Sequence, residues 1–379
     1  MISAQKLWTG KALRLAVAVS LLLGVTLTQV ASGADKPPKI NFGYIFTTHH
    51  TPFIVAMAEG EKLKDQGVYL KSLVPKQKYQ LMVQGKPIAE LDVVVAKSGS
   101  ETATLFAQKR LDVALASITA MMSGIDKGMP IKVLCPTHVD GMGLVFPKDT
   151  KLKGWEDFLA YVKASKKPVK IGYHSPTSAP RIALEGALHR AGLKVTGDAN
   201  DLKAQVLLVD LKTTANLIPA LVSGQVDACV GPAPFPEVAE VKGVGKVVLD
   251  LRDLPPPGFW HNFPCCVMAA TQETISKHPE VLKNLTKLLT ANSEWSNQNK
   301  DKIADITAAW IGVPAAAVKK STIIYTSQPS ENWLRGVGLY LDMLNKMNKF
   351  KGKLKGKKLA EVEPIIFDFS FVEKPAAKK

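Results

Sequence analysis

Short apolar runs alternate with amphipathic stretches along most of the chain from Lys39 onward. The apolar runs have the length of buried strands, and the stretches between them have helical spacing. This alternation is typical of βα units around a mostly parallel sheet, so the sequence predicts an α/β fold. The predicted strands are 39–46, 91–97, 112–117, 131–135, 169–173, 206–210, 227–230 and 246–251, and the predicted helices are 53–64, 101–110, 119–127, 154–164, 179–191 and 215–223. Residues 271–350 favour consecutive helices, and 78–87 a hairpin arm.

Two segments with the same layout suggest two similar lobes. In 108–114 and in 223–229, a helix end and a polar turn lead to an aspartate that opens a buried strand. The apolar strands 144–147 and 265–270 bracket the middle of the chain, and we expect them to be the two crossings of a hinge. The predicted organisation is a first part of lobe I at 34–145, lobe II at 146–264, and the hinge return with the helical remainder of lobe I and a lysine-rich tail at 265–379.

Residues 1–33 have the three parts of a secretory signal peptide. Their only charges are Lys6, Lys11 and Arg14, residues 15–30 are mainly apolar, and small residues precede Ala34. The apolar run is at the short end for spanning a membrane, which leaves an uncleaved anchor as the alternative. We expect cleavage near Gly33–Ala34 and a periplasmic location.

The net charge of +16 invites a nucleic-acid or membrane interpretation, but the charge is concentrated. Seven lysines and no acidic residue lie within Lys346–Lys358, and the body outside this stretch is only modestly basic. That distribution differs from the basic face of a nucleic-acid binder, so no nucleic-acid partner is expected. The lysine stretch is expected to be a solvated loop or helix end, with attraction to a membrane surface as the other interpretation.

The cysteines and histidines follow none of the familiar ligand spacings. An exported chain can oxidise its four cysteines (Cys135, Cys229, Cys265 and Cys266), but a bridge between the two neighbours would be strained, and buried free thiols that act as small apolar residues are the favoured interpretation. His138, His174 and His261 fall in separate predicted loops without HExxH spacing. We therefore expect no metal site and no cofactor. Hydrolase and nucleotide-loop motifs are also missing, so no catalytic residues are expected.

Hydroxyl side chains recur after the predicted strands in both halves. Ligands of open α/β sheets bind beyond the carboxyl ends of strands, where helix N-termini favour anionic or polar groups. Helix capping alone would explain any single hydroxyl, but the same bias in both halves favours a polar cleft. Ser178 gives the best helix start, because Ala179 and Pro180 follow it. The segment 255–264, with three prolines followed by Phe259, Trp260 and Phe263, packs under a loop or lines a cleft beside the hinge.

With these parts in order, the chain resembles the solute-binding proteins of nitrate, taurine and alkanesulfonate ABC transporters, a group that includes thiamine-precursor-binding proteins. The motifs that carry the resemblance are His49-His50-Thr51-Pro52, Ser98-Gly99-Ser100, Leu111-Asp112-Val113-Ala114, Lys127-Gly128-Met129-Pro130-Ile131, residues 172–178 and 224–228, and Pro264-Cys265-Cys266-Val267. The resemblance implies a type II periplasmic binding protein fold, with two lobes joined by a two-strand hinge and the ligand cleft between them.

The resemblance also implies a function. The chain would be a periplasmic receptor, acting as a monomer, that delivers a small anionic or strongly polar solute to the permease of an ABC importer. The ligand-facing candidates are His49, His50, Ser117, Thr119, Thr177, Ser178 and Phe235, with His261 added from the proline-rich segment. Many relatives have a tryptophan and a glutamate ahead of proline where this chain has Gly231-Pro232-Ala233-Pro234, which leaves the ligand's identity open. The alternative is a thiamine-pyrimidine-synthase-like enzyme on the same fold, which would use clustered cysteines and histidines with iron.

Overall fold

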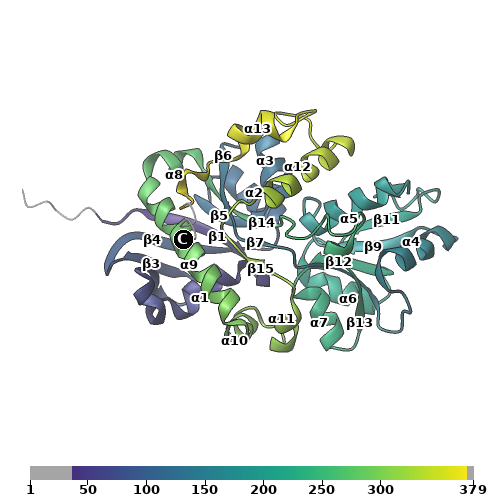
Figure 1. Ribbon diagram of the computed structural model, residues 1–379, viewed down its shortest axis with the longest axis horizontal. Coiled ribbons are helices and arrows are strands. Elements are labelled where there is room, and N and C mark those ends of the chain that lie inside the picture. Colours follow the sequence, from purple (N-terminus) through teal and green to yellow (C-terminus); the bar gives the residue numbers. More distant parts are fainter. Residues whose placement is uncertain (1–35, 374–379) are drawn as a thin grey trace, which may run out of the picture. The chain divides into compact units, whose positions relative to one another are not determined.

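The computed structural model describes residues 36–373, and the predicted signal peptide lies outside the described residues. The chain from Pro37 onward forms one compact unit. This unit contains two separate β-sheets, each built from βα units (Figure 1).

The first sheet has seven strands in the order β2-β3-β4-β1-β5-β14-β6. β1 lies parallel to β4 and β5, whereas β14 runs antiparallel to its neighbours β5 and β6. Its interior strands are almost entirely apolar and buried, as expected for a sheet covered by helices on both faces. The strands are β1 Lys39–Ile45, β2 Val68–Val74, β3 Lys78–Val83, β4 Lys86–Ala96, β5 Val113–Ser117, β6 Ile131–Pro136 and β14 Cys266–Thr271.

The second sheet has six strands in the order β10-β11-β9-β12-β8-β13. Its first four strands are parallel, and β8 runs antiparallel to both β12 and β13. The strands are β8 Met142–Pro147, β9 Val169–Tyr173, β10 Val195–Thr196, β11 Val206–Asp210, β12 Ala228–Pro232 and β13 Gly245–Asp250. A two-stranded pair, β7 His138–Val139 with β15 Ile324–Tyr325, lies apart from both sheets.

The helices follow the strands as the sequence pattern predicts. The helices of the first half are α1 Thr51–Glu59, α2 Gly99–Ala107, α3 Ile118–Asp126, α4 Gly154–Ala164 and α5 Ala179–Arg190. Those that follow are α6 Leu217–Val222, α7 Phe235–Val241, α8 Gln272–Lys277, α9 Pro279–Gln298, α10 Lys300–Ile311, α11 Ala315–Lys320, α12 Glu331–Lys346 and α13 Leu359–Ile366. The predicted helix 53–64 is two elements, because α1 continues as the 3-10 helix η2, Gly60–Gln66. The predicted run of helices from residue 271 is interrupted by β15.

The chain passes twice between the two sheets. Each passage lies a few residues before the apolar strand that was predicted to form the hinge, 144–147 or 265–270. The first passage precedes β8, and the second precedes β14, so 144–147 and 266–270 lie inside the two sheets rather than between them. The passages pair with each other: Val139 bridges Pro264, Asp140 N donates to Phe263 O at 3.0 Å, and Phe263 N donates to the Asp140 carboxylate at 2.9 Å. Two paired extended segments of this kind form a hinge.

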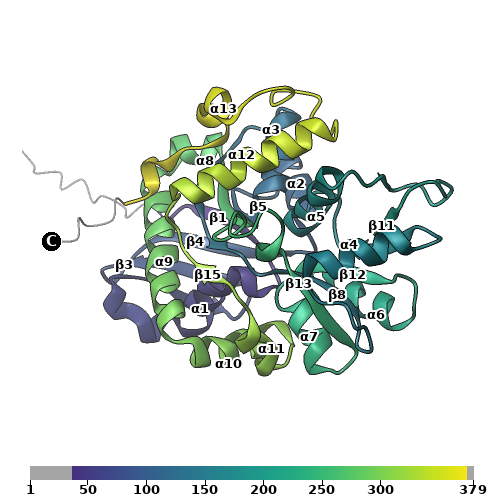
Figure 2. The same cartoon turned by 45° about the vertical axis from the view of Figure 1, so that its right-hand side comes forward.

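Helix α12 also connects the two halves. It packs on α5 (Figure 2). In this contact the Tyr340 hydroxyl donates to Ala179 O at 3.5 Å, and Met343 lies close to Gly186. The chain then returns to the first sheet, where Phe367 bridges Val133 of β6.

Two peripheral predictions are confirmed. Residues 78–87 form the hairpin of β3 and β4, and its turn has Gln84 and Gly85 at positive φ. The lysine stretch is a solvated loop after α12 in which the lysines are exposed, while Phe350 and Leu354 are buried.

Within residues 36–373, no helix combines the length and hydrophobicity needed to cross a membrane.

Candidate functional site

A small cavity lies where the carboxyl ends of strands from both sheets meet. Strands β1, β4 and β5 of the first sheet lead into it, as do β9, β11 and β12 of the second, and β14 begins beside it. It holds about 30 Å³ of space for water-sized solvent, which is room for a water or two. The lining residues are Ile45, Thr47, His49, Gly99, Ser117, His174, Ser178, Ala179, Pro180, Thr214, Pro232, Cys265 and Cys266.

The first sheet's side of the cavity is fixed by helix starts. Ser117 is the N-cap of α3, and its Oγ accepts from Ala120 N at 3.3 Å. The start of α2 packs closely against it, because a Cβ on Gly99 would lie 2.9 Å from Ala120 Cβ and 3.0 Å from Ser117 Oγ. Thr47 Oγ1 accepts from His49 N at 3.3 Å and donates to Ala233 O at 2.7 Å. That second bond joins the loop after β1 to the loop after β12.

The second sheet's side presents polar groups without partners. Ser178 occupies the N-cap position of α5, yet its hydroxyl makes no capping bond. Ser178 Oγ and His174 Nδ1 are buried and have no hydrogen-bond partner among the described residues. Burying an unpaired hydroxyl or imidazole nitrogen costs free energy, so both atoms favour a ligand or water in the cavity.

The two rims of the cavity touch through hydroxyl groups. Ser100 Oγ lies 2.8 Å from Ser175 Oγ and 2.9 Å from Thr177 Oγ1. Thr119 Oγ1 donates to Thr177 O at 2.6 Å, and Ser117 Oγ donates to the same carbonyl at 3.3 Å. These bonds cross from the loops of one sheet to those of the other, so they hold the two rims of the cavity together.

The polar groups in the mainly apolar cavity wall are uncharged. Burial, with a smaller contribution from His49, lowers the pKa of His174 to about 4, so its imidazole is neutral at neutral pH. The nearby Arg181 is engaged elsewhere, because it pairs with Glu185 at 2.9 Å and lies over the Tyr173 ring at 4.7 Å. Since no carboxylate, lysine or arginine is among the lining residues described, the site offers hydroxyl, imidazole and thiol groups.

Five of the eight candidates from the sequence gather at this cavity. His49, Ser117 and Ser178 line it, while Thr119 and Thr177 bond to each other at its rim. His50 does not line the cavity; it is buried, and its Nδ1 accepts from Ile45 N at 3.0 Å.

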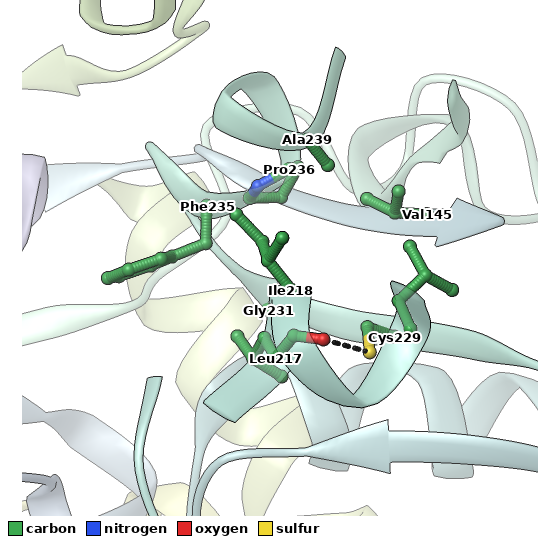
Figure 3. Close-up of a pocket in the computed structure, with 9 residues that line it drawn as sticks. Val145, Leu217, Ile218, Cys229, Gly231, Phe235, Pro236 and Ala239 are labelled. Carbon is green, nitrogen blue, oxygen red and sulfur yellow. Dashed lines mark hydrogen bonds between the residues drawn. The ribbon is translucent and has the colours of Figure 1, made fainter. Parts of the chain in front are cut away.

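The remaining two candidates lie elsewhere. Phe235 borders an apolar gap between α6, α7 and β12, with its ring directed away from Cys229, whose Sγ donates to Leu217 O at 3.1 Å (Figure 3). That gap has about 10 Å³ of solvent space, at the lower limit for one water, and is a packing defect of the core. His261 is half-exposed, 3.9 Å from the Asp253 carboxylate.

The structure also brings together residues that the sequence separates. His49, His138, Cys265 and Cys266 are all buried, and their ligand atoms lie within 4.8 Å of one another. All four cysteines are free thiols. Burial alone would raise the pKa of Cys266, but the neighbouring Cys265 thiol and the imidazoles of His138, His49 and His50 hold it well below its usual value. Sequence spacing had argued against such a group, because the three segments are far apart along the chain.

Sequence reasoning also missed some of the cavity wall. Thr47, His174, Thr214 and Pro232 line the cavity but are not among the ligand-facing residues that the sequence predicts. Their signal was available, since each follows the carboxyl end of a predicted strand.

The fold is that of known solute-binding proteins. The structure resembles a ligand-binding component of an ABC-type import system from Staphylococcus aureus, solved with zinc bound, with a TM-score of 0.67 and 16% identity over 90% of this chain and 100% of that one. It also resembles the periplasmic nitrate-binding protein of Synechocystis PCC 6803, with a TM-score of 0.64 and 14% identity over 89% and 87% of the two chains. A third likeness is the alkanesulfonate-binding protein of Xanthomonas axonopodis pv. citri bound to MOPS, with a TM-score of 0.63 and 13% identity over 88% and 99%.

Sequence comparison extends this assignment beyond the fold. An uncharacterised protein of Methanocaldococcus jannaschii is 31% identical over 121 residues, which cover 31% of this chain and 83% of that protein. The family model described as the NMT1-like family matches residues 33–312. This match spans well over half of the chain, both sheets included, and the chain therefore belongs to the NMT1-like family.

Proposed function

We propose that this protein is the periplasmic receptor of an ABC importer and that it delivers a small anionic or strongly polar solute to the permease. The observation that carries the proposal is the pair of unpartnered buried atoms, Ser178 Oγ and His174 Nδ1, at the cavity between the two sheets. With its rims in contact the cavity has room for only a water or two, so the solute would enter between separated rims and then contact loops of both sheets.

The chemistry of the wall supports an oxyanion or a similarly polar group. The helix starts at α2, α3 and α5 surround the cavity, and the N-terminal end of a helix favours negative charge. Hydroxyl groups and a neutral imidazole supply further hydrogen bonds without a fixed counter-charge. The nitrate- and alkanesulfonate-binding relatives carry ligands of this class in their names, which supports the same class here.

A ligand screen tests this function. The chain from Ala34 onward, freed of retained ligand by unfolding and refolding, is heated with nitrate, alkanesulfonates, taurine, other small oxyanions and neutral pyrimidines. A ligand at a hundredfold excess over its Kd stabilises the folded protein by about 2.7 kcal/mol, which gives a clear rise in Tm. We expect at least one anionic or strongly polar compound to do so. A protein that binds none of them and converts a substrate instead would be an enzyme, and the receptor function would be rejected.

The periplasmic location has its own test. N-terminal sequencing of exported protein is expected to begin near Ala34, and recovery of Met1 would favour an uncleaved anchor.

A further inference from the structure

The four residues His49, His138, Cys265 and Cys266, here called the Cys2His2 cluster, come from three segments that the fold brings together. His49 lies in η1, Thr48–His50, directly after β1, and His138 opens β7. Cys265 and Cys266 lead into β14, where Ile118 N donates to Cys265 O at 2.8 Å and Thr137 N donates to Cys266 O at 3.0 Å. These two backbone bonds fix the turn of the chain that lets neighbouring thiols converge.

Three of the six separations within the cluster match those of a tetrahedral metal site, and all four ligand atoms lie within 4.8 Å of one another. With Zn–S bonds of about 2.3 Å and Zn–N bonds of about 2.05 Å, tetrahedral angles separate two sulfurs by about 3.8 Å and a sulfur and a nitrogen by about 3.6 Å. The two Sγ atoms lie 3.9 Å apart, and His49 Nδ1 lies 3.4 Å from Cys265 Sγ and 3.7 Å from Cys266 Sγ. Three separations thus agree with the ideal values to within about 0.2 Å.

The outer nitrogens of the two imidazoles are oriented as in metal-bound histidines. His49 Nε2 lies 2.8 Å from Gly141 O, to which it can donate, and this leaves the lone pair of Nδ1 facing the thiols. His138 Nδ1 is 3.3 Å from Val139 O, while its Nε2 is buried without a partner. A backbone carbonyl that holds one ring nitrogen and so directs the other at the ion is the usual support of a histidine ligand.

We propose that the Cys2His2 cluster is a binding site for one borderline-soft transition-metal ion, with zinc as the reference ion. Two metal–sulfur and two metal–nitrogen bonds form, and the two thiol protons pass to solvent. The bound ion with two thiolates is electrically neutral, which suits a site whose four residues are at most 5% exposed.

The ion would be resident rather than the transported solute. None of the four ligands comes from the second sheet. His49 follows β1 of the first sheet, His138 lies in the first hinge passage, and Cys265 and Cys266 lie where the second passage enters β14. Opening of the cavity therefore leaves the coordination intact. The ion would tie both hinge passages, through His138 and Cys265, to the loop after β1.

The experiment measures metal in the full chain, exported and purified without chelator or reductant. Elemental analysis is expected to give about one transition-metal ion per chain. After removal of this ion, added Co²⁺ is expected to produce the intense d–d bands of a tetrahedral site. It should also produce a thiolate-to-cobalt charge-transfer band with the intensity expected for two thiolate ligands. Zn²⁺ is expected to displace Co²⁺ and abolish both signals. These spectra need no variant, so they test the site even if a substitution impairs folding.

Variants assign the ligands. Cys266→Ser and His138→Gln are each expected to weaken Zn²⁺ binding at least tenfold, because each removes one of four bonds. Cys229→Ser is the matched control, since Cys229 is also a buried thiol but donates to Leu217 O far from the cluster, and its Zn²⁺ affinity is expected to stay within about twofold. A folded wild-type protein that binds neither Co²⁺ nor Zn²⁺, a Cys266→Ser variant with unchanged affinity, or a Cys265–Cys266 disulfide in the purified protein would each overturn the proposal.

Discussion

Ser178 illustrates how one side chain departs from the ordinary rule for its position. A serine at an N-cap normally accepts a hydrogen bond from an N–H of the first helical turn. Here that bond is missing, although the residue is buried and Pro180 fixes the helix start. The hydroxyl is therefore available to a ligand, and its position at the end of α5 places a ligand where helix polarity favours negative charge.

Ser178→Asp is expected to weaken an anionic ligand at least tenfold, because a carboxylate would occupy the anion's position and repel it. Isothermal titration with the best ligand from the screen measures the change. Ser276→Asp, on the exposed face of α8, adds the same charge away from the cavity and is expected to leave Kd within about twofold. An anionic ligand indifferent to Ser178→Asp would place the site elsewhere.

His174 makes the stability depend on pH in a defined direction. Burial, and to a smaller extent His49, lowers its pKa from 6.5 to about 4 in the folded protein. Between these values the unfolded chain binds more protons than the folded one, so this residue's contribution to stability is complete above about pH 6.5 and falls as the pH is lowered toward 4. The expected slope is about 1.4 kcal/mol per pH unit.

Urea unfolding gives the free energy of unfolding of the wild type and of His174→Gln at each pH from 7 down to 4. The difference between the two free energies, followed over pH, isolates the contribution of His174. The subtraction matters because burial raises the pKa of Glu237 to about 7, so that carboxyl opposes the histidine over the same range. Glu237→Gln is the companion variant, and its difference from the wild type is expected to change in the opposite direction. If the difference between the wild type and His174→Gln did not change with pH, the imidazole would titrate alike in the folded and unfolded chain, and burial would not lower its pKa.

Single residues differ in how far the sequence could predict them. Ser117 and Ser178 could be found because both follow the carboxyl end of a recognisable strand, and the sheet brings such ends together. The Cys2His2 cluster could not, because its members lie in three distant segments whose only meeting point is the hinge. Phe235 and His261 were drawn from the right regions, but one faces a core gap and the other solvent.

Among the elements, the lysine-rich loop after α12 owes its shape to one carboxylate. Asp126, at the end of α3, is buried, and its two oxygens accept backbone N–H bonds from Lys351 at 2.9 Å, Gly352 at 3.0 Å and Leu354 at 2.9 Å. The loop can therefore expose its lysines while Leu354 stays in the core.

Asp126→Asn is expected to lower the free energy of unfolding by about 1–3 kcal/mol, because the amide nitrogen replaces one acceptor and leaves buried N–H groups unpaired. Denaturant unfolding measures the loss. The control Asp342→Asn removes only an exposed pairing with Lys358 at 3.1 Å and is expected to cost less than about 1 kcal/mol. Equal losses would show that Asp126 does not organise the loop.

The lysines of this loop are expected to be dispensable for ligand binding, because none lines the cavity. Replacing Lys351, Lys353, Lys355, Lys357 and Lys358 by glutamine should leave Kd within about threefold, since exposed charges are screened over roughly 8 Å. A tenfold loss in titration calorimetry would mean that the loop borders the ligand.

The type of an element could be predicted where its burial and its hydrophobic periodicity agree. It was harder to predict where a hinge segment and the strand that follows it are both apolar. Strands β1, β5 and β9 occur where the apolar runs predict them. The hinge was expected at 144–147 and 265–270, yet it lies just before each. Apolar strands and an apolar hinge have the same pattern, and only strand pairing distinguishes them.

At the level of the whole molecule, a few hydroxyl contacts hold the two rims of the cavity together. Ser100 alone reaches both Ser175 and Thr177 of the opposite rim. Each such bond contributes about 0.5–1.5 kcal/mol, enough together to shift an equilibrium between open and closed forms.

Ser100→Ala is expected to weaken ligand binding by about five- to a hundredfold, mainly through a faster koff, because the closed form loses two bonds. Stopped-flow measurement of ligand release tests the rate, and small-angle scattering of the ligand-free variant is expected to give a larger radius of gyration. Ser123→Ala removes a similar hydroxyl that bonds only within α3, to Thr119 O at 2.8 Å, and is expected to change neither quantity. A Ser100→Ala protein with unaltered koff would show that these contacts do not hold the rims.

The positions where the described chain enters and leaves the fold have a practical consequence. Strand β1 lies within the first sheet, and the last described segments return to it through the Val133–Phe367 bridge and η5, Phe369–Phe371. A tag or surface linker on either terminus would therefore anchor the same half of the molecule and leave the second sheet free to swing about the paired hinge segments. If the ligand closes the two halves as proposed, a sensor immobilised in this way would keep that motion, and a dye on exposed Leu202, near β11, would report it against the fixed support.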